Sequence, residues 1–276
     1  MRLGYLGPEG TFSEQAAILY EPAAEFVPYP SIRSVAEAVD AREIDEGVVP
    51  IENSLHGSVI DVLDFLIRTD RTKIKFELAI PIEQCLIVVP GADRREVEVI
   101  YSHPQALGQC QEFLAREYPG VELVASLSTA GSVTDMVESD RPAAAIAPFR
   151  AAEIHGAEVA ERGIQGNRSN FTRFVTLASE DSLPTGHDKT SLAFWYASDA
   201  PGTLYETLGI FSSRGINLVK IESRPTGESL GEYVFLVDIE GHRLDAIVAA
   251  ALEELTKVTS ELRVFGSYPM LRSEPA

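Results

Sequence analysis

Short apolar runs alternate with stretches of helical spacing along most of the chain. Apolar runs bounded by polar turns predict strands, and apolar positions three and four residues apart predict amphipathic helices. A strand followed by a helix recurs, which predicts βα units and a mostly parallel sheet. The predicted pairs are 2–6 with 14–20, 47–51 with 58–68, 97–101 with 105–118, 121–125 with 130–138, and 143–147 with 150–155.

The stretch 76–89 is rich in β-forming residues and lacks helical spacing, so we expect it to carry the chain from one lobe to another. The last strand of this region is predicted at 170–178. Pro184 and Gly186 then mark a linker over 181–189. We therefore predict an α/β domain over 1–180, with one lobe of about 1–76 and 165–180 and another of about 77–164.

The remainder of the chain has a different order of elements. It predicts a ferredoxin-like βαββαβ unit over 190–270. Such a unit has a one-sided sheet, which commonly pairs with a second copy, so dimerisation is expected. The predicted elements are strand 191–197, helix 201–214, strands 216–223 and 232–240, helix 244–255 and strand 261–268.

The charge of the chain restricts its partners. The net charge is −19 and the pI is near 4.6, which argues against nucleic acid, because phosphate binding needs clustered Lys and Arg. Small ligands are favoured instead. Lysines are few, five against eighteen arginines, which is typical of a surface adapted to high salt. An ordinary acidic protein is the alternative.

The sequence predicts a cytoplasmic protein. Residues 1–6 predict a strand, without the apolar segment and cleavage site of a secretion signal. The longest apolar runs are far shorter than the roughly 20 residues of a membrane span. Cys85 and Cys110 fall in a predicted strand and helix, where we expect buried reduced thiols.

Three predicted turns from strand to helix carry well-defined polar caps. Residues 7–14 contain a capping box from Thr11 to Glu14, and 102–105 contain a second one. Residues 50–58 place polar side chains directly after a buried strand. In an open α/β sheet these turns meet at the carboxyl ends of the strands, where helix N-termini attract anions. The sequence therefore predicts an anion pocket.

Other kinds of site are not indicated. The five histidines are scattered without metal-ligand spacing, and no G-x-S-x-G nucleophile turn occurs. The turn at 7–10 does not have the dinucleotide-binding spacing. Residues 167–174 form a polar loop that enters a strand with Thr172 and Arg173. A bidentate Arg there suits a carboxylate, although an exposed edge strand is the alternative.

Taken together, four segments resemble prephenate dehydratase in their order and spacing. They are residues 7–13 (Gly-Pro-Glu-Gly-Thr-Phe-Ser), 50–54 (Pro-Ile-Glu-Asn-Ser), 102–110 (Ser-His-Pro-Gln-Ala-Leu-Gly-Gln-Cys) and 172–174 (Thr-Arg-Phe). The C-terminal part resembles an ACT regulatory domain. Residues 201–204 (Pro-Gly-Thr-Leu) replace the family's Gly-Ala-Leu-Val, and the Glu-Ser-Arg-Pro motif at 222–225 is intact.

The resemblance covers essentially the whole chain and implies a two-lobed catalytic domain, similar to type II periplasmic binding proteins, with the active site in the cleft. It implies conversion of prephenate to phenylpyruvate with loss of CO2 and water, without cofactor or metal. It also implies an ACT domain that binds phenylalanine across a homodimer or homotetramer. The monofunctional form is expected. Arogenate dehydratase and a non-catalytic anion sensor with an ACT domain are the alternatives.

The resemblance also implies site residues. Either Thr172 or Glu52 would assist departure of the ring hydroxyl, and the sequence leaves that choice open. The catalytic set is Thr172, Glu52, Asn53 and Gln109; the substrate-binding set is Thr11, Ser54, Ser102, Gln105, Arg173 and Phe174; and the phenylalanine-binding set is Gly202, Thr203, Leu204, Asn217, Leu218, Glu222 and Ser223.

Overall fold

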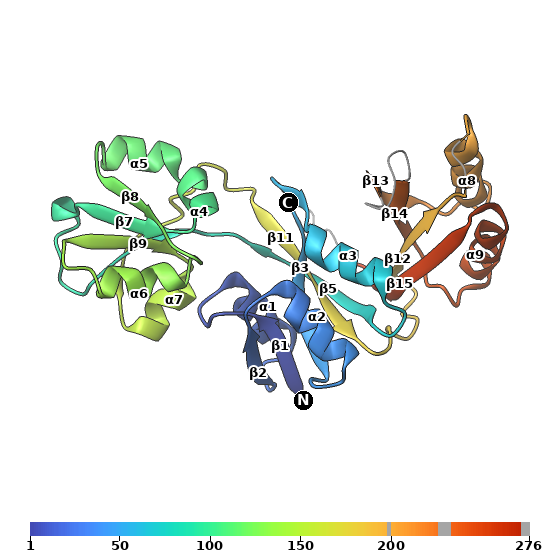
Figure 1. Cartoon of the computed structure of the whole chain (residues 1–276), viewed down its shortest axis with the longest axis horizontal. Coiled ribbons are helices and arrows are strands. Elements are labelled where there is room, and N and C mark those ends of the chain that lie inside the picture. The colour runs from blue at the N-terminus through green and yellow to red at the C-terminus, as the bar shows by residue number, and fades with distance from the viewer. Residues whose placement is uncertain (198–199, 226–232, 272–276) are drawn as a thin grey trace. The chain divides into compact units, whose positions relative to one another are not determined.

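The computed structural model describes residues 1–197, 200–225 and 233–271 (Figure 1). Glu232, the first residue of one predicted strand, lies outside these ranges. The chain divides into two compact units, and the predicted lobe boundaries stay a prediction. Unit 1 comprises Met1–Val35, Val48–Val59 and Leu78–Phe174, and unit 2 comprises Ala36–Gly47, Ile60–Glu77 and the described residues from Val175 onward.

The first sheet has the strand order β2-β1-β3-β11-β5, with β4 paired to β3. β1 and β2 are parallel. In unit 1, α1 packs on this sheet through a core that includes Leu3, Ala16 and Phe174. The elements are β1 (Arg2–Leu6), α1 (Phe12–Tyr20), β2 (Glu25–Tyr29), α2 (Ile32–Asp40), β3 (Glu46–Asn53), β4 (Gly57–Ser58), α3 (Ile60–Arg68), β5 (Lys73–Pro81) and β11 (Phe171–Ala178).

The second sheet, in unit 1, has the order β10-β6-β9-β7-β8 and is covered on both faces. α4 and α5 pack on one face and α6 and α7 on the other (Figure 1). Cys85 and Cys110 are buried and free, as expected, and burial raises the pKa of Cys85 to about 11 and that of Cys110 to about 12. The elements are β6 (Cys85–Val88), β7 (Val99–Ser102), α4 (Pro104–Gln109), α5 (Gln111–Glu117), β8 (Glu122–Ala125), α6 (Gly131–Val137), β9 (Ala143–Ala147), α7 (Phe149–His155) and β10 (Glu158–Arg162).

The third sheet, in unit 2, has the order β13-β14-β12-β15, with α8 and α9 packed against one face. This is the predicted βαββαβ unit. Within unit 2, this sheet contacts β5 of the first sheet, where Lys189 and Glu77 form a buried ion pair at 2.8 Å. The elements are β12 (Asp188–Trp195), α8 (Thr203–Ser212), β13 (Leu218–Pro225), β14 (Tyr233–Glu240), α9 (Ala246–Val258) and β15 (Glu261–Pro269).

Several parts of the secondary structure differ from the sequence-based expectation. β2, α2 and β10 were not predicted, and the expected helix at 105–118 is interrupted at Cys110 between α4 and α5. The second sheet is mixed rather than parallel, because β6 runs antiparallel to both β9 and β10. Pro28 in β2 explains one omission, since proline is confined to edge strands and β2 lies at the sheet edge.

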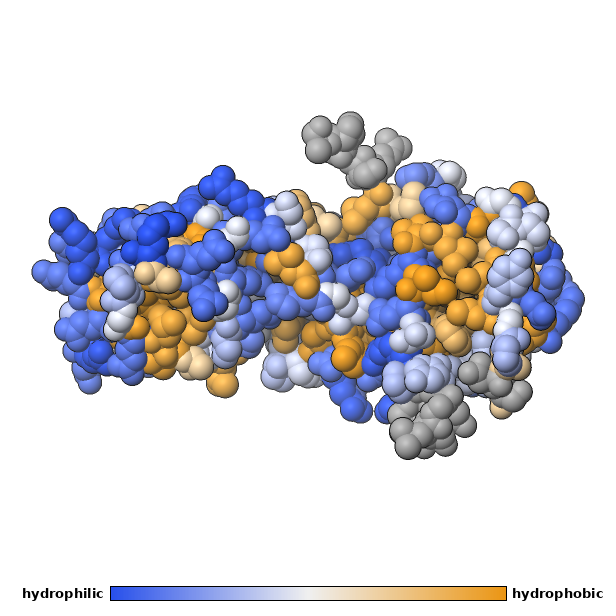
Figure 2. Space-filling view, turned by 90° about the horizontal axis from the view of Figure 1, so that it is seen from above, coloured by the Kyte–Doolittle hydropathy of each residue, from blue (hydrophilic) through white to orange (hydrophobic). Residues whose placement is uncertain are grey.

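On the face drawn in Figure 2, hydrophilic side chains cover wide areas between hydrophobic patches.

With a net charge of −19, we expect the charged groups of the protein to repel one another. Salt should relieve this repulsion, since the Debye length falls to about 3 Å at 1 M. The thermal midpoint and activity should rise together with KCl, the midpoint by about 4 °C or more. An uncharged osmolyte of equal osmolality is the control. A flat or falling response to KCl would contradict adaptation to salt.

Candidate active site and effector domain

The turn between β1 and α1 is built around the predicted capping box. The backbone N–H of Glu14 donates to Thr11 Oγ1 at 3.3 Å. The Glu14 carboxylate reaches the N–H of Gly10 at 2.7 Å rather than that of Thr11. The Thr11 hydroxyl donates to the carbonyl of Leu6 at 3.0 Å. These bonds fix the start of α1 with its first N–H groups at the end of β1.

Asn53 joins the end of β3 to β11. Its amide nitrogen donates to Asn170 Oδ1 at 2.8 Å and to Thr172 Oγ1 at 3.0 Å. Its carbonyl oxygen accepts the backbone N–H groups of Leu55 and His56. Because the Thr172 oxygen accepts from Asn53, its hydroxyl proton is left for another acceptor. Within the described chain the Thr172 hydroxyl does not donate a hydrogen bond.

The turn between β7 and α4 brings in two glutamines. His103 caps α4, and its Nδ1 accepts from the N–H of Gln105 at 3.3 Å. The Gln105 side chain lies 3.2 Å from the His56 ring. One helical turn later, the Gln109 carbonyl oxygen accepts from the Gln84 amide at 3.3 Å. Each glutamine is therefore held from a second segment of the chain.

These turns surround one cavity of about 300 Å³ in unit 1. Of the predicted catalytic and substrate-binding residues, the structure brings five together in its lining: Thr11, Asn53, Gln105, Gln109 and Thr172. Five further lining residues belong to the three turns predicted to form an anion pocket: Gly7, Phe12, Ser13, Pro50 and His103. The lining residues outside those turns, which were not predicted, are Leu6, Ile82, Gln84, Ala106, Leu127, Ser128 and Thr129.

The other predicted residues take supporting positions. Ser102 is fully buried and donates to the carbonyl of Ile146 at 2.6 Å. Phe174 is a core side chain. Glu52 and Arg173, which lie on neighbouring strands, pair with each other at 2.9 Å.

The Ser54 hydroxyl ties the turn after β3 to the start of β11, donating to the carbonyl of Ser169 at 3.1 Å and accepting from the N–H of Phe171 at 2.9 Å. Glu52, Ser54, Ser102, Arg173 and Phe174 are not among the residues that line the cavity, and their predicted roles in catalysis and substrate binding stay a prediction.

The signal for the missed residues is partly present in the sequence. Leu127, Ser128 and Thr129 follow β8 and precede α6, so they form another turn at a strand's carboxyl end. The rule that identified the other turns applies to them too. Gln84 lies at the crossing from β5 to β6, where no sequence rule points to a pocket.

None of the described lining residues is Lys, Arg, Asp or Glu, and His103 is their one titratable side chain. The polar lining consists of hydroxyl and amide side chains together with backbone N–H groups near helix starts. Such donors can hold an anion without a paired cation. The described residues contain no group of three or more side chains suited to a metal ion.

In the βαββαβ unit, Gly202 is the N-cap of α8 and has a φ of 94°, a conformation that favours glycine. A side chain built there would meet nothing within 4 Å. Thr203 donates to the carbonyl of Ala200 at 2.9 Å. Leu204 and Leu218 pack against the domain core.

The remaining predicted effector residues lie before and along β13. The Asn217 amide donates to Glu240 at 2.9 Å. Glu222 lies 3.5 Å from Lys220 on the same strand. Ser223 is exposed.

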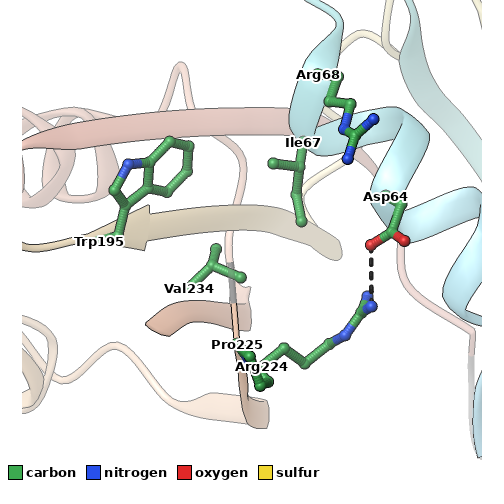
Figure 3. A pocket seen from close by; sticks show the side chains of 7 residues that line it. All are labelled: Asp64, Ile67, Arg68, Trp195, Arg224, Pro225 and Val234. Carbon is green, nitrogen blue, oxygen red and sulfur yellow. Dashed lines mark hydrogen bonds and ion pairs between the residues drawn. The ribbon is translucent and has the colours of Figure 1, made fainter. Parts of the chain in front are cut away.

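The end of β13 faces α3 within unit 2 (Figure 3). Arg224 Nη2 donates to Asp64 Oδ1 at 2.9 Å, while Nη1 is buried without a partner among the described residues. A cavity of about 110 Å³ adjoins this ion pair. Its lining residues are Asp64, Ile67, Arg68, Trp195, Arg224, Pro225 and Val234.

The fold places the cavity in an α/β unit, and the chain also carries a βαββαβ domain. The prephenate dehydratase family model matches residues 3–182, and the ACT domain model matches 190–257. The chain belongs to the prephenate dehydratase family and has a C-terminal ACT domain. The family's reaction is a decarboxylating dehydration, the work of a carbon–oxygen lyase. No described helix is long and apolar enough to cross a membrane.

Curated relatives and a solved structure agree with this assignment. The chain is 42% identical to the bifunctional chorismate mutase/prephenate dehydratase of Aquifex aeolicus over 98% of its own length and 74% of the relative's. It is 37% identical to prephenate dehydratase of Bacillus subtilis, over 97% of this chain and 98% of that one. The crystal structure of prephenate dehydratase from Arthrobacter aurescens in complex with L-Phe covers 100% of this chain and 92% of that one, with a TM-score of 0.90 and 37% identity.

Proposed function

We propose that the cavity in unit 1 binds prephenate and that Thr172 donates a hydrogen bond to the departing ring hydroxyl. The observation that carries this assignment is the Asn53 amide at 3.0 Å from Thr172 Oγ1. By donating to that oxygen, Asn53 turns the hydroxyl proton towards another acceptor. A neutral hydroxyl is a poor acid, so Thr172 passes on or shares a proton that solvent ultimately replaces.

The electron flow in this reaction needs little from the protein. The bond from the ring to its carboxylate breaks and CO2 leaves. The electron pair moves through the ring, and the bond to the hydroxyl oxygen breaks. That oxygen takes up a proton and departs as water, leaving an aromatic ring. The cavity therefore has to orient the substrate, hold its charge and assist the leaving oxygen.

Glu52 is the less suitable donor in this arrangement. Its carboxylate accepts hydrogen bonds from Arg173 at 2.9 and 3.1 Å and does not line the cavity. The Arg173 guanidinium is engaged in the same pair, so it holds β3 against β11 rather than a substrate carboxylate. These contacts support Thr172 as the residue that faces the leaving group.

The charge of the lining favours prephenate over arogenate. Arogenate carries an ammonium group where prephenate carries a ketone, and a buried ammonium requires a carboxylate or several acceptors. No Asp or Glu is among the described lining residues. We therefore expect prephenate to be turned over faster than arogenate.

One assay separates the candidate functions. The protein is incubated with prephenate and with arogenate, and phenylpyruvate and phenylalanine are measured. Phenylpyruvate from prephenate is the expected product. Phenylalanine from arogenate alone would identify an arogenate dehydratase. No product from either compound, with binding of prephenate detected by calorimetry, would identify a sensor.

Feedback inhibition by phenylalanine through paired ACT domains is the second part of the proposal. The related crystal structure contains L-Phe. Edge strand β13 exposes Val219 and Ile221 by 45% and 46%, and the neighbouring strand exposes Tyr233 by 46%. An exposed apolar edge of this kind favours pairing with a second copy, as a dimer or tetramer.

A cytoplasmic location stays a prediction from the sequence.

The Arg224–Asp64 ion pair offers this regulation a route to the catalytic residues. Arg224 belongs to the Glu-Ser-Arg-Pro motif on β13, and Asp64 lies on α3 (Figure 3). α3 begins directly after the hairpin of β3 and β4, which carries Asn53. A ligand that moves the end of β13 would therefore pull on α3, and through the chain on the residue that positions Thr172.

Asp64→Asn should weaken this coupling without removing catalysis. We expect kcat/KM without effector to stay within about 2-fold, because Asp64 lies outside the catalytic cavity. Phenylalanine should still bind, while its effect on activity falls by about 5-fold or more. Calorimetry measures the binding and steady-state assays the inhibition. Asp61→Asn, an exposed change on the same helix, is the control. Full inhibition of Asp64→Asn would exclude this route.

A further inference from the structure

Gln84 is a buried lining residue of the catalytic cavity that the mechanism above does not use. It is 2% exposed, and its carbonyl oxygen Oε1 is buried without a hydrogen-bond partner among the described residues. Buried polar atoms in folded proteins nearly always have partners, so the unpaired oxygen of a residue that lines a binding cavity points to a ligand group.

The backbone of Gln84 and its side-chain nitrogen are held by hydrogen bonds. Its backbone N–H donates to Gln165 Oε1 at 2.9 Å, and its carbonyl accepts from the N–H of Ile164 at 3.1 Å. Its side-chain nitrogen donates to Gln109 Oε1 at 3.3 Å. The two backbone bonds anchor the residue, and the bond from Nε2 to Gln109 orients the side-chain amide that carries Oε1. An acceptor oriented in this way before the ligand arrives binds a donor with less loss of entropy.

The chemistry of the substrate identifies the group that Oε1 accepts. At neutral pH the two carboxylates and the ketone of prephenate are acceptors only, and the ring hydroxyl is its single O–H donor. A hydrogen-bond acceptor in this cavity can therefore pair with one substrate group. We infer that Gln84 Oε1 accepts the hydrogen bond of the ring hydroxyl, opposite the donor Thr172, an inference that rests on the proposed function.

This contact would assist the reaction as well as binding. As the bond to the ring breaks, the hydroxyl oxygen takes up a proton and becomes water. Its O–H groups then become better donors, so the bond to the Gln84 carbonyl strengthens as the leaving group departs. Interactions that strengthen towards the transition state raise kcat. The wrong orientation of the hydroxyl, with its proton towards Thr172, is also disfavoured.

Two non-reacting ligands test the inference with the intact chain. One is a ring-saturated analogue of prephenate that keeps the hydroxyl, and the other is its deoxy counterpart. Calorimetry should show that the wild type binds the hydroxyl analogue more tightly than the deoxy analogue, by about 10-fold or more. Gln84→Met, an apolar replacement of similar length, should reduce this preference by about 5-fold or more and lower kcat by a similar factor.

Two further variants exclude a purely structural role. Gln84→Glu keeps an acceptor, so it should retain the preference for the hydroxyl, although its charge weakens binding of both dianions. Gln111→Met, the same change at an exposed position of α5, should alter neither affinity. An unchanged preference in Gln84→Met, or an equal loss for both analogues, would overturn the role of Gln84. Absence of prephenate turnover in the wild type would instead refute the proposed function.

Discussion

Thr172→Ala should lower kcat by about 10²-fold or more while the fold and KM stay close to those of the wild type. The reason is geometric. The Asn53 amide occupies one lone pair of the Thr172 oxygen at 3.0 Å, so the variant removes the single donor that this pair of residues presents to the leaving group. Steady-state kinetics with prephenate and a thermal melt measure the two effects separately.

Two variants on the same strand control this prediction. Thr172→Ser keeps the hydroxyl and should recover most of the activity. Thr176→Val removes the hydroxyl of another threonine of β11 that is fully buried, lacks a hydrogen-bond partner in the described chain and does not line the cavity. Its turnover should be normal. Near-wild-type kcat in Thr172→Ala would refute the assignment.

Much of the fold could be predicted because local signals were strong. Buried strands such as 143–147 read as continuous apolar runs, and Thr11 and His103 cap the helices that follow their turns. α2 was missed although Val35, Ala36 and Val39 form a helical stripe, because that stripe is short and its residues are small. β10 is a half-exposed edge strand, which leaves little periodicity to detect.

The candidate site could be predicted only as far as strand ends imply proximity. Thr11 and Asn53 line one cavity because β1 and β3 lie in the same sheet, and strands of an α/β sheet present their carboxyl ends together. Gln105 follows β7 of the second sheet, and no local sequence rule predicts that turns of two sheets share a cavity. The pairing of Glu52 with Arg173 depends on β3 lying beside β11, and strand order is not visible in local sequence. For that reason the sequence did not predict that Arg173 pairs with Glu52, and its role in substrate binding stays a prediction.

Gly202→Val should weaken phenylalanine binding and inhibition by about 10-fold or more while kcat without effector is retained. Gly202 has a φ of 94°, which a β-branched residue rarely adopts, so valine displaces the first N–H groups of α8. Those groups are the donors we expect to meet the effector's carboxylate, and glycine leaves the space above them open.

A glycine with a similar positive φ, far from α8 in the sequence, provides the control for Gly202→Val. Gly120 has a φ of 85° and equally open surroundings in unit 1, so Gly120→Val should cost stability but leave the response to phenylalanine intact. Gly202→Asn tolerates a positive φ and should bind with intermediate affinity. Calorimetric titration and inhibition curves are compared for all variants. If inhibition survives Gly202→Val unchanged, phenylalanine acts elsewhere, and its carboxylate and ring make the catalytic cavity the next site to test.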